Sequence, residues 1–117
     1  MSVTEARRLA VRKHENQRDR DGSFHIAHVA RVAERVPLTD GYQRVAWLHD
    51  VFEDSETGID ELRDRLPSCE LEALLLLTRR ADESYEAYSD RIAGAPGDAG
   101  CLARAVSAST ARLKPCA

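Results

Sequence analysis

The sequence predicts an all-α protein. Two observations favour this fold class: apolar residues recur at the three- and four-residue spacing of amphipathic helices, and no segment shows the apolar–polar alternation of a half-buried strand. The chain has 117 residues, of which 43% are hydrophobic, which is enough for one compact core but not for two domains. We therefore predict a single domain, residues 1–117, folded as an irregular helical bundle.

The expected helices follow one another between clear signals. Ser2 has capping-box spacing with Glu5 ahead of the first helix, and Thr57 has the same spacing with Asp60 ahead of the fourth. Glycine and proline supply the breaks, at Asp21-Gly22, Pro37, Pro67 and Gly94-Ala-Pro-Gly97. The expected helical ranges are about 3–17, 26–35, 40–54, 59–65, 69–79, 84–93 and 98–106.

Charge and composition exclude several classes of protein. The 17 basic and 20 acidic residues give a net charge of −3, which is no signal for binding nucleic acid or a membrane surface. Residues 2–16 are charged throughout and do not resemble a signal peptide. Three widely spaced cysteines indicate neither a disulfide framework nor a zinc knuckle. We therefore expect a cytoplasmic domain with reduced cysteines, and neither a nucleic acid nor a membrane as partner.

The segment 45–54, Val-Ala-Trp-Leu-His-Asp-Val-Phe-Glu-Asp, places four side chains able to bind metal or move protons in an apolar run. In a helix, residues four apart share a face, so His49 lies below Glu53 and Asp50 below Asp54. The apolar surroundings predict burial, where a carboxylate costs several kcal/mol unless it is paired or bound to a metal. The alternative is a chance pair, His49-Asp50, at a helix end with its charges solvated.

These motifs resemble the HD-type metal-dependent phosphohydrolases, and within them the hydrolase domain of the RelA/SpoT alarmone enzymes and its small single-domain relatives. In that domain a helix start of the form Tyr-Ile-x-His-Pro precedes Ala-Leu-Leu-His-Asp-Val-Val-Glu-Asp-Thr. This chain has His25-Ile-Ala-His28 and then, at 46–55, Ala-Trp-Leu-His-Asp-Val-Phe-Glu-Asp-Ser. The resemblance covers about residues 5–106 and implies a helical bundle of HD-domain type.

The resemblance also implies roles for individual residues. His28, His49 and Asp50 would bind a divalent cation, usually Mn²⁺ in the alarmone hydrolases, and Glu53 and Asp54 match the catalytic acidic pair. A divalent ion lowers the pKa of a bound water and polarises a phosphoryl oxygen, while a nearby carboxylate orients or deprotonates the nucleophile. The implied reaction is hydrolysis of the 3′-diphosphate of guanosine tetra- or pentaphosphate, or of a related nucleotide.

The chain departs from the family pattern at its substrate-binding pair. The family carries two basic residues before the helix of the first metal histidine, and this pair aligns with Asp19-Arg20. Arg20 therefore matches, and Arg18 is close enough to substitute for the second residue. The alternative is that residues 18–21 form a solvated charge run in a loop.

A second departure lies in the tail, residues 107–117. The family's fourth metal ligand is an aspartate, but Thr110 stands at that position and Lys114 replaces a following asparagine. After Val106 the resemblance stops abruptly and the apolar spacing of a last helix fades. We hypothesise a shifted reading frame or a degenerate terminus, which the DNA around codon 106 would test by restoring the pattern in another frame or failing to. The loss of the fourth ligand predicts weak metal binding and impaired activity.

Two other functional interpretations follow from the same residues. The first is a non-catalytic HD-like helical domain that binds a nucleotide or a protein partner after losing its fourth ligand. The second is a non-haem iron oxygenase, because two histidines and one carboxylate are the ligands of that class. Outside this set, His14 is expected to be a solvated helix residue, and His25, at the family's tyrosine, to pack locally at a helix start, with substrate contact as the alternative.

Overall fold

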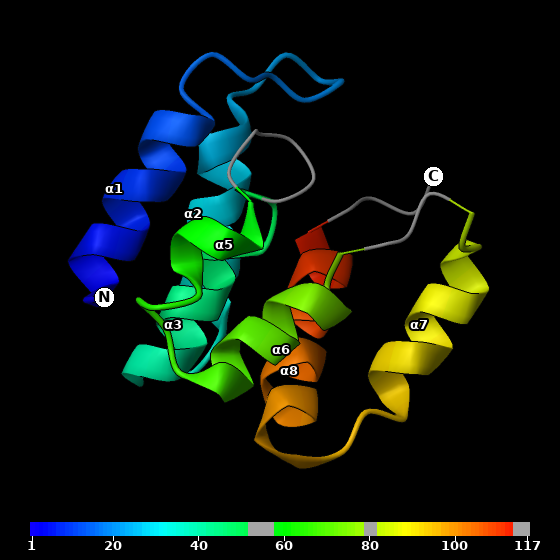
Figure 1. The fold of residues 1–117 in the computed structure, drawn as a ribbon. Helices are drawn as coiled ribbons and strands as arrows, with labels where there is room; N and C mark the ends of the chain where they lie inside the picture. Colours follow the sequence, from blue (N-terminus) through cyan, green and yellow to red (C-terminus); the bar gives the residue numbers. More distant parts are fainter. Residues whose placement is uncertain (52–57, 79–81, 114–117) are drawn as a thin grey trace.

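The computed structural model describes residues 1–51, 58–78 and 82–113, with the backbone alone at 59, 60 and 111–113. Over these ranges the predicted all-α fold is confirmed, since no strand occurs beyond one isolated bridge between Arg18 and Phe24. The helices, shown in Figure 1, are α1 (Val3–Lys13), α2 (His25–Arg35), α3 (Asp40–Leu48), α5 (Ile59–Leu62), α6 (Ser68–Leu76), α7 (Tyr85–Ala93) and α8 (Gly97–Leu113). Within these ranges no helix is both long and apolar enough to cross a bilayer.

Helix α1 begins with the capping box that the sequence predicts. The Ser2 hydroxyl accepts a hydrogen bond from the Glu5 backbone N–H at 3.0 Å, and the Glu5 carboxylate accepts one from the Ser2 backbone N–H. One face of the helix buries Ala6, Leu9 and Ala10 against α3. The amphipathic spacing of these residues therefore fixes which side of α1 meets the core.

Helix α3 lies at the centre of the bundle and packs against α1, α2, α6 and α8. It is short and its inward side is fully buried at Val45, Ala46 and Leu48. Helix α7, in contrast, stands at the edge of the molecule beside α8 (Figure 1). The core that supports the site is thus formed by α1, α2, α3, α6 and α8.

Two helix ends differ from the prediction near the candidate residues. The helix expected over 40–54 is interrupted, because α3 ends at Leu48 and the backbone turns at His49 and Asp50. Likewise α1 ends at Lys13 rather than Gln17, and His14 is its C-terminal cap. His14 and His49 therefore lie at the carboxyl ends of α1 and α3, where the helices stop.

The expected end of the last helix at Val106 is also wrong, because α8 continues to Leu113. The Ser109 hydroxyl donates to the Ala105 carbonyl at 2.9 Å, and the Thr110 hydroxyl donates to the Val106 carbonyl at 3.0 Å. Bonds of this kind satisfy a hydroxyl within its own helix, so the serine and threonine residues do not interrupt it. Divergence from the family pattern therefore does not end the helix.

Candidate metal centre

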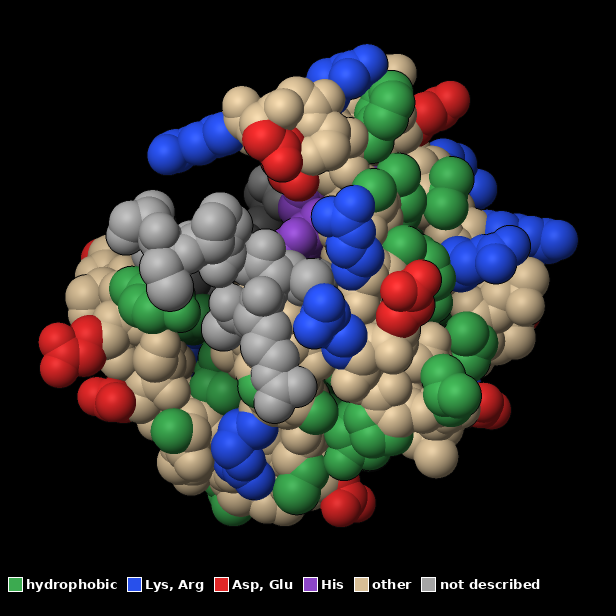
Figure 2. All heavy atoms as spheres, turned by 180° about the vertical axis from the view of Figure 1, so that it is seen from behind, with side chains coloured by type: hydrophobic (Ala, Val, Ile, Leu, Met, Phe, Trp, Pro, Cys, Tyr) green, Lys and Arg blue, Asp and Glu red, His purple; other side chains and the backbone are tan. Residues whose placement is uncertain are grey.

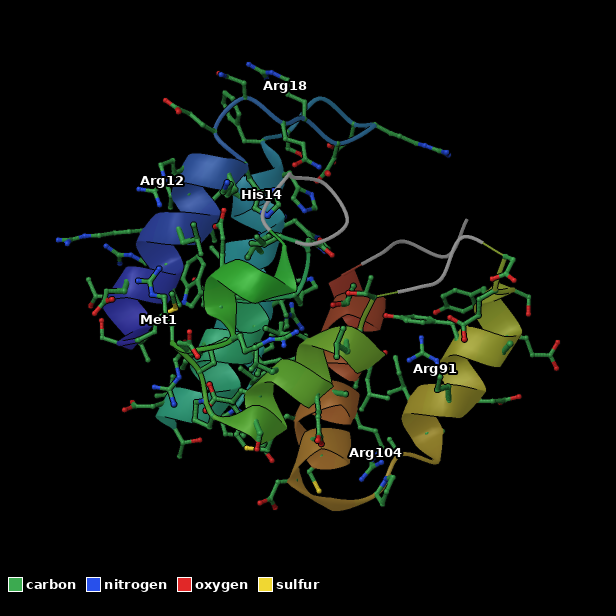
Figure 3. The ribbon with its side chains drawn as sticks, in the orientation of Figure 1. Met1, Arg12, His14, Arg18, Arg91 and Arg104 are labelled. Carbon is green, nitrogen blue, oxygen red and sulfur yellow. The ribbon has the colours of Figure 1, made fainter. Side chains whose placement is uncertain are left out.

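All four histidines of the chain gather at one end of the bundle. His14 follows α1, His25 and His28 belong to α2, and His49 follows α3. The ring centroids of His14 and His25 lie 4.8 Å apart, and those of His25 and His28 lie 5.7 Å apart. Figure 3 shows His14 at the end of α1 that faces α2, and Figure 2 shows histidine atoms in a recess between acidic and basic side chains.

The loop between α1 and α2 positions one side of this cluster. Gly22 has a φ of 87°, a left-handed conformation that glycine adopts without a steric cost, and the loop turns back there. The second half of the loop is held in place by a hydrogen bond from the His25 backbone N–H to the Gln17 carbonyl at 2.9 Å. Asp19 is thereby brought beside the His25 ring, with its Oδ1 2.8 Å from His25 Nδ1.

His49 has one paired and one unpaired ring nitrogen. Its side chain is buried, and Nδ1 lies 2.6 Å from the Ala46 carbonyl oxygen, so Nδ1 must be the donor. Nε2 is also buried and has no hydrogen-bond partner among the described residues. It lies 3.4 Å from Oδ2 of Asp50. A histidine with a bonded Nδ1–H and a free Nε2 has the form of a metal ligand.

His25 connects the two carboxylates of the cluster. Its Nε2 lies 2.8 Å from Asp50 Oδ2, while its Nδ1 bonds Asp19. The hydrogen bond to Asp50 is the main cause that raises the pKa of His25 to about 9, against the opposing effect of burial, and Asp19 adds to it. Burial acts to raise the pKa of Asp50, but neighbouring His49 and the bond from His25 outweigh it and hold that pKa well below its usual range.

His28 completes the cluster from the next turn of α2. Its ring stacks on His25 with an interplanar angle of 26°. Burial lowers the pKa of His28, and the neighbouring His49 and His25 lower it further. The neutral imidazole, which is the form that binds a metal, is therefore favoured.

The structure thus brings His28, His49 and Asp50 into one cluster, but it does not arrange them as a finished metal site. Among the described residues, no group of three or more His, Cys, Asp or Glu side chains stands ready to hold an ion. Asp50 Oδ2 accepts a hydrogen bond from His25 instead. The unpaired Nε2 of His49 and the neighbouring Oδ2 of Asp50 are nevertheless one nitrogen and one oxygen that a divalent transition metal could bind together.

The other residues expected at the site fall in three places. Glu53 and Asp54 lie outside the described residues. Arg18 is exposed on the α1–α2 loop (Figure 3), where it donates to the Gly22 carbonyl at 2.8 Å and stacks on Phe24, and Arg20 is exposed on the same loop. Thr110, at the family's fourth ligand, is half-buried on α8 and bonds its own helix.

The prediction that His14 is solvated is wrong, because this residue is completely buried. The sequence contained a signal for it: His14 continues the four-residue spacing of Ala6 and Ala10, which form the buried face of α1. The sequence places Asp19 at a mismatch with the family's basic pair or in a solvated charge run, and neither interpretation predicts its contact with His25. That contact depends on the path of the loop.

No model of a known protein family matches the chain, and no curated protein sequence is significantly similar to it. The resemblance to the HD-type phosphohydrolases therefore depends on the motifs around His28 and His49-Asp50. The clustering of these residues is independent of the motifs themselves, because residues 21 positions apart in the sequence need not be close in the structure.

Proposed function

We propose that this chain is a metal-dependent phosphohydrolase that removes the 3′-diphosphate of guanosine tetra- or pentaphosphate, or of a related nucleotide, in the cytoplasm. The observation that carries the proposal is the buried, unpaired Nε2 of His49, 3.4 Å from a carboxylate oxygen of Asp50. A buried nitrogen without a hydrogen-bond partner costs about 1–3 kcal/mol, which bonding to a metal would remove.

In this proposal His28, His49 and Asp50 hold the cation, which is Mn²⁺ in the family that the motifs resemble. The bound ion would supply a water of lowered pKa and polarise the phosphoryl oxygen. Ala46 orients the His49 ring through its carbonyl oxygen, so that Nε2 faces Asp50. Arg18 and Arg20, on the loop that borders the cluster, are the residues proposed to bind the anionic substrate.

The test is release of pyrophosphate from guanosine tetraphosphate by the purified chain with and without Mn²⁺. We expect His49→Ala and Asp50→Ala each to abolish metal binding and release. Asp64→Asn, on an exposed residue of the segment after α5, is a control for a lost carboxylate and should change neither. Release that survives both site substitutions would contradict the proposal.

Glu53→Gln separates binding from chemistry. If Glu53 acts on the water or substrate rather than on the ion, this variant keeps its metal and loses turnover by roughly 10²–10⁴-fold. Metal content by elemental analysis and turnover are measured on the same sample. A loss below about threefold would exclude Glu53 from this role.

One observation favours a second candidate, the non-catalytic HD-like domain. Asp50 is already paired with His25, and Thr110 contributes a hydroxyl bonded to its own helix instead of a carboxylate. The cluster is therefore partly neutralised without any cation. Two measurements distinguish the candidates: the metal content of the purified protein, and nucleotide binding before and after treatment with a chelator. A non-catalytic domain would contain no metal and would bind the nucleotide equally well in both cases.

A further inference from the structure

Three of the clustered histidines share one hydrogen-bonding pattern. An oxygen atom lies against Nδ1 in each: Gln17 Oε1 at 2.7 Å from His14, Asp19 Oδ1 at 2.8 Å from His25, and the Ala46 carbonyl at 2.6 Å from His49. An acceptor at Nδ1 fixes a ring proton there. Within the described residues Nε2 is then unpaired in His14 and His49, whereas in His25 it donates to Asp50 and must lose its proton before it can bind a metal. Histidines that bind metals are oriented in this way, commonly by a carboxylate or a backbone carbonyl.

The Nε2 atoms of His25 and His49 meet at the same oxygen. Asp50 Oδ2 lies 2.8 Å from His25 Nε2 and 3.4 Å from His49 Nε2. Two donor atoms, each about 2.1 Å from one ion, are roughly 3.0 Å apart at a right angle and roughly 3.4 Å apart at the tetrahedral angle. The 3.4 Å separation matches the tetrahedral angle, and the 2.8 Å separation is slightly shorter than the right-angle value. No group of three ligands is already formed among the described residues, so one ion would bind these three atoms only after a small shift of the His25 ring.

We propose that His25 is a ligand of the metal centre and supplies, through Nε2, the protein ligand that is missing at Thr110. The inference rests on the proposed metal site at His28, His49 and Asp50. His25 replaces no residue of that site, and its ring already contacts both His28 and Asp50. Asp19, whose side chain is 35% exposed, holds the ring in the required orientation from the far side.

The donor set that follows differs from the one that the resemblance implies. Three imidazoles and one carboxylate favour Zn²⁺, Co²⁺ or Ni²⁺, whereas carboxylate and water ligands suit Mn²⁺. The substitution of an imidazole for a carboxylate thus predicts a centre that prefers zinc to manganese. The reaction class is unchanged, because zinc also activates bound water.

The experiment is calorimetric titration of the full chain with ZnCl₂ and with MnCl₂, and of His25→Phe, which keeps an aromatic ring and removes both nitrogens. We expect the unsubstituted chain to bind zinc more tightly than manganese, and His25→Phe to weaken zinc binding by at least about 100-fold. His14→Phe is the control within the cluster, because among the described residues no hydrogen bond or ion pair joins His14 to Asp50, and it should weaken zinc binding by less than about threefold. An equal loss in the two variants, or none in His25→Phe, would overturn the inference.

A second measurement covers the case in which His25→Phe does not fold. X-ray absorption at the zinc edge of the unsubstituted protein counts imidazole ligands, and we expect three, while a count of two would refute the role of His25. If the protein binds no divalent ion, this inference and the proposed function both fail. Zinc bound through His25 without pyrophosphate release would refute only the proposed hydrolase function. Pyrophosphate release by a centre with two imidazole ligands would refute only the role of His25.

Discussion

At the scale of single residues, His25 is the most heavily engaged polar side chain of the cluster. It forms hydrogen bonds with Asp19 and Asp50 and has ring contacts with His14 and His28. Its position is only 8% exposed. In the metal-free protein its positive charge offsets part of the negative charge of the two carboxylates, and this compensation depends on pH.

We predict that the metal-free protein loses stability between neutral and alkaline pH. The pKa of His25 is raised to about 9, so its contribution is complete below the unfolded value of about 6.5 and is lost as pH rises through 9. The pKa of Asp50 is held low, so its contribution is lost only in acid. Urea unfolding with a chelator at pH 6 and pH 9.5 should differ by roughly 1–3 kcal/mol.

His25→Phe is the control for this pH dependence. It removes the titrating group, so its unfolding free energy should change much less over the same interval. An unsubstituted chain that unfolds with the same free energy at both pH values would show that the His25–Asp50 pair does not contribute to stability.

At the scale of elements, α3 and α6 are joined by an ion pair in the interior. Arg44 on α3 donates to the two carboxylate oxygens of Glu70 on α6 at 2.7 and 2.8 Å, and Glu70 is 3% exposed. Arg44 also donates to the Met1 carbonyl at 3.3 Å, which ties the amino terminus to the same pair. Two-pronged geometry of this kind orients α3, whose carboxyl end carries His49.

We predict that Glu70→Gln lowers the free energy of unfolding by about 3 kcal/mol, because it leaves the Arg44 charge uncompensated in a largely buried place. Glu5→Gln is the control, since Glu5 pairs with Arg65 at 3.1 Å where both side chains are about half exposed. Exposed pairs contribute little, so this variant should be close to unchanged. Chemical unfolding measures both, and equal effects would refute the assignment.

The junction between α7 and α8 supplies a prediction about packing. A Cβ atom at Gly100 would lie 2.0 Å from the Ala95 carbonyl oxygen, which is backbone and cannot simply turn away. Arg104 Nη1 donates to that same carbonyl at 2.6 Å, so the site is crowded on two sides. Figure 3 shows Arg104 on the α8 side of this junction.

Gly100→Ala should therefore destabilise the protein by roughly 1–3 kcal/mol through overpacking. Gly94→Ala is the comparison at the same junction, because its nearest atom, the Asp90 carbonyl oxygen, is 3.5 Å from the added Cβ and its φ is −95°. We expect Gly94→Ala to be neutral or slightly stabilising. Thermal unfolding that ranks the two variants in the opposite order would contradict this account of the junction.

At the scale of the whole molecule, α8 packs against α2, α3 and α6 and carries the divergent residues 107–113 beside helices that support the cluster. Since α8 is helical through Thr110, a carboxylate at that position would be carried by an ordered helix. We predict that Thr110→Asp raises the affinity for Mn²⁺ at least about tenfold by restoring an anionic ligand. Ala108→Asp, which adds the same charge on an exposed position of α8, should have little effect.

Calorimetry with MnCl₂ measures both variants. Equal manganese affinity in Thr110→Asp and the unsubstituted chain would show that position 110 does not reach the metal. In that case His25 alone would have to account for any binding beyond His28, His49 and Asp50.

The sequence by itself determined the all-α fold and the nearness of His49 to Asp50. Helices could be predicted because the spacing of apolar residues and caps acts locally, within one or two turns. Adjacent residues are near one another in any fold, so the pair His49-Asp50 was available from the chain alone. The position of His28 beside that pair is a prediction from the family resemblance. In the structure the His28 ring stacks on His25, whose Nε2 lies 2.8 Å from Asp50 Oδ2.

Only the tertiary structure decided how the site is built. The contact of Asp19 with His25 and the continuation of α8 beyond Val106 depend on the path of a loop and on helix packing, which residue spacing does not encode. In His14, His25 and His49, the oxygen atom that lies against Nδ1 fixes the orientation of the ring and so the direction of Nε2. These oxygens belong to backbone and side chains whose positions are set by packing. The sequence therefore predicts which histidines are candidates, and the tertiary structure determines how their rings are oriented.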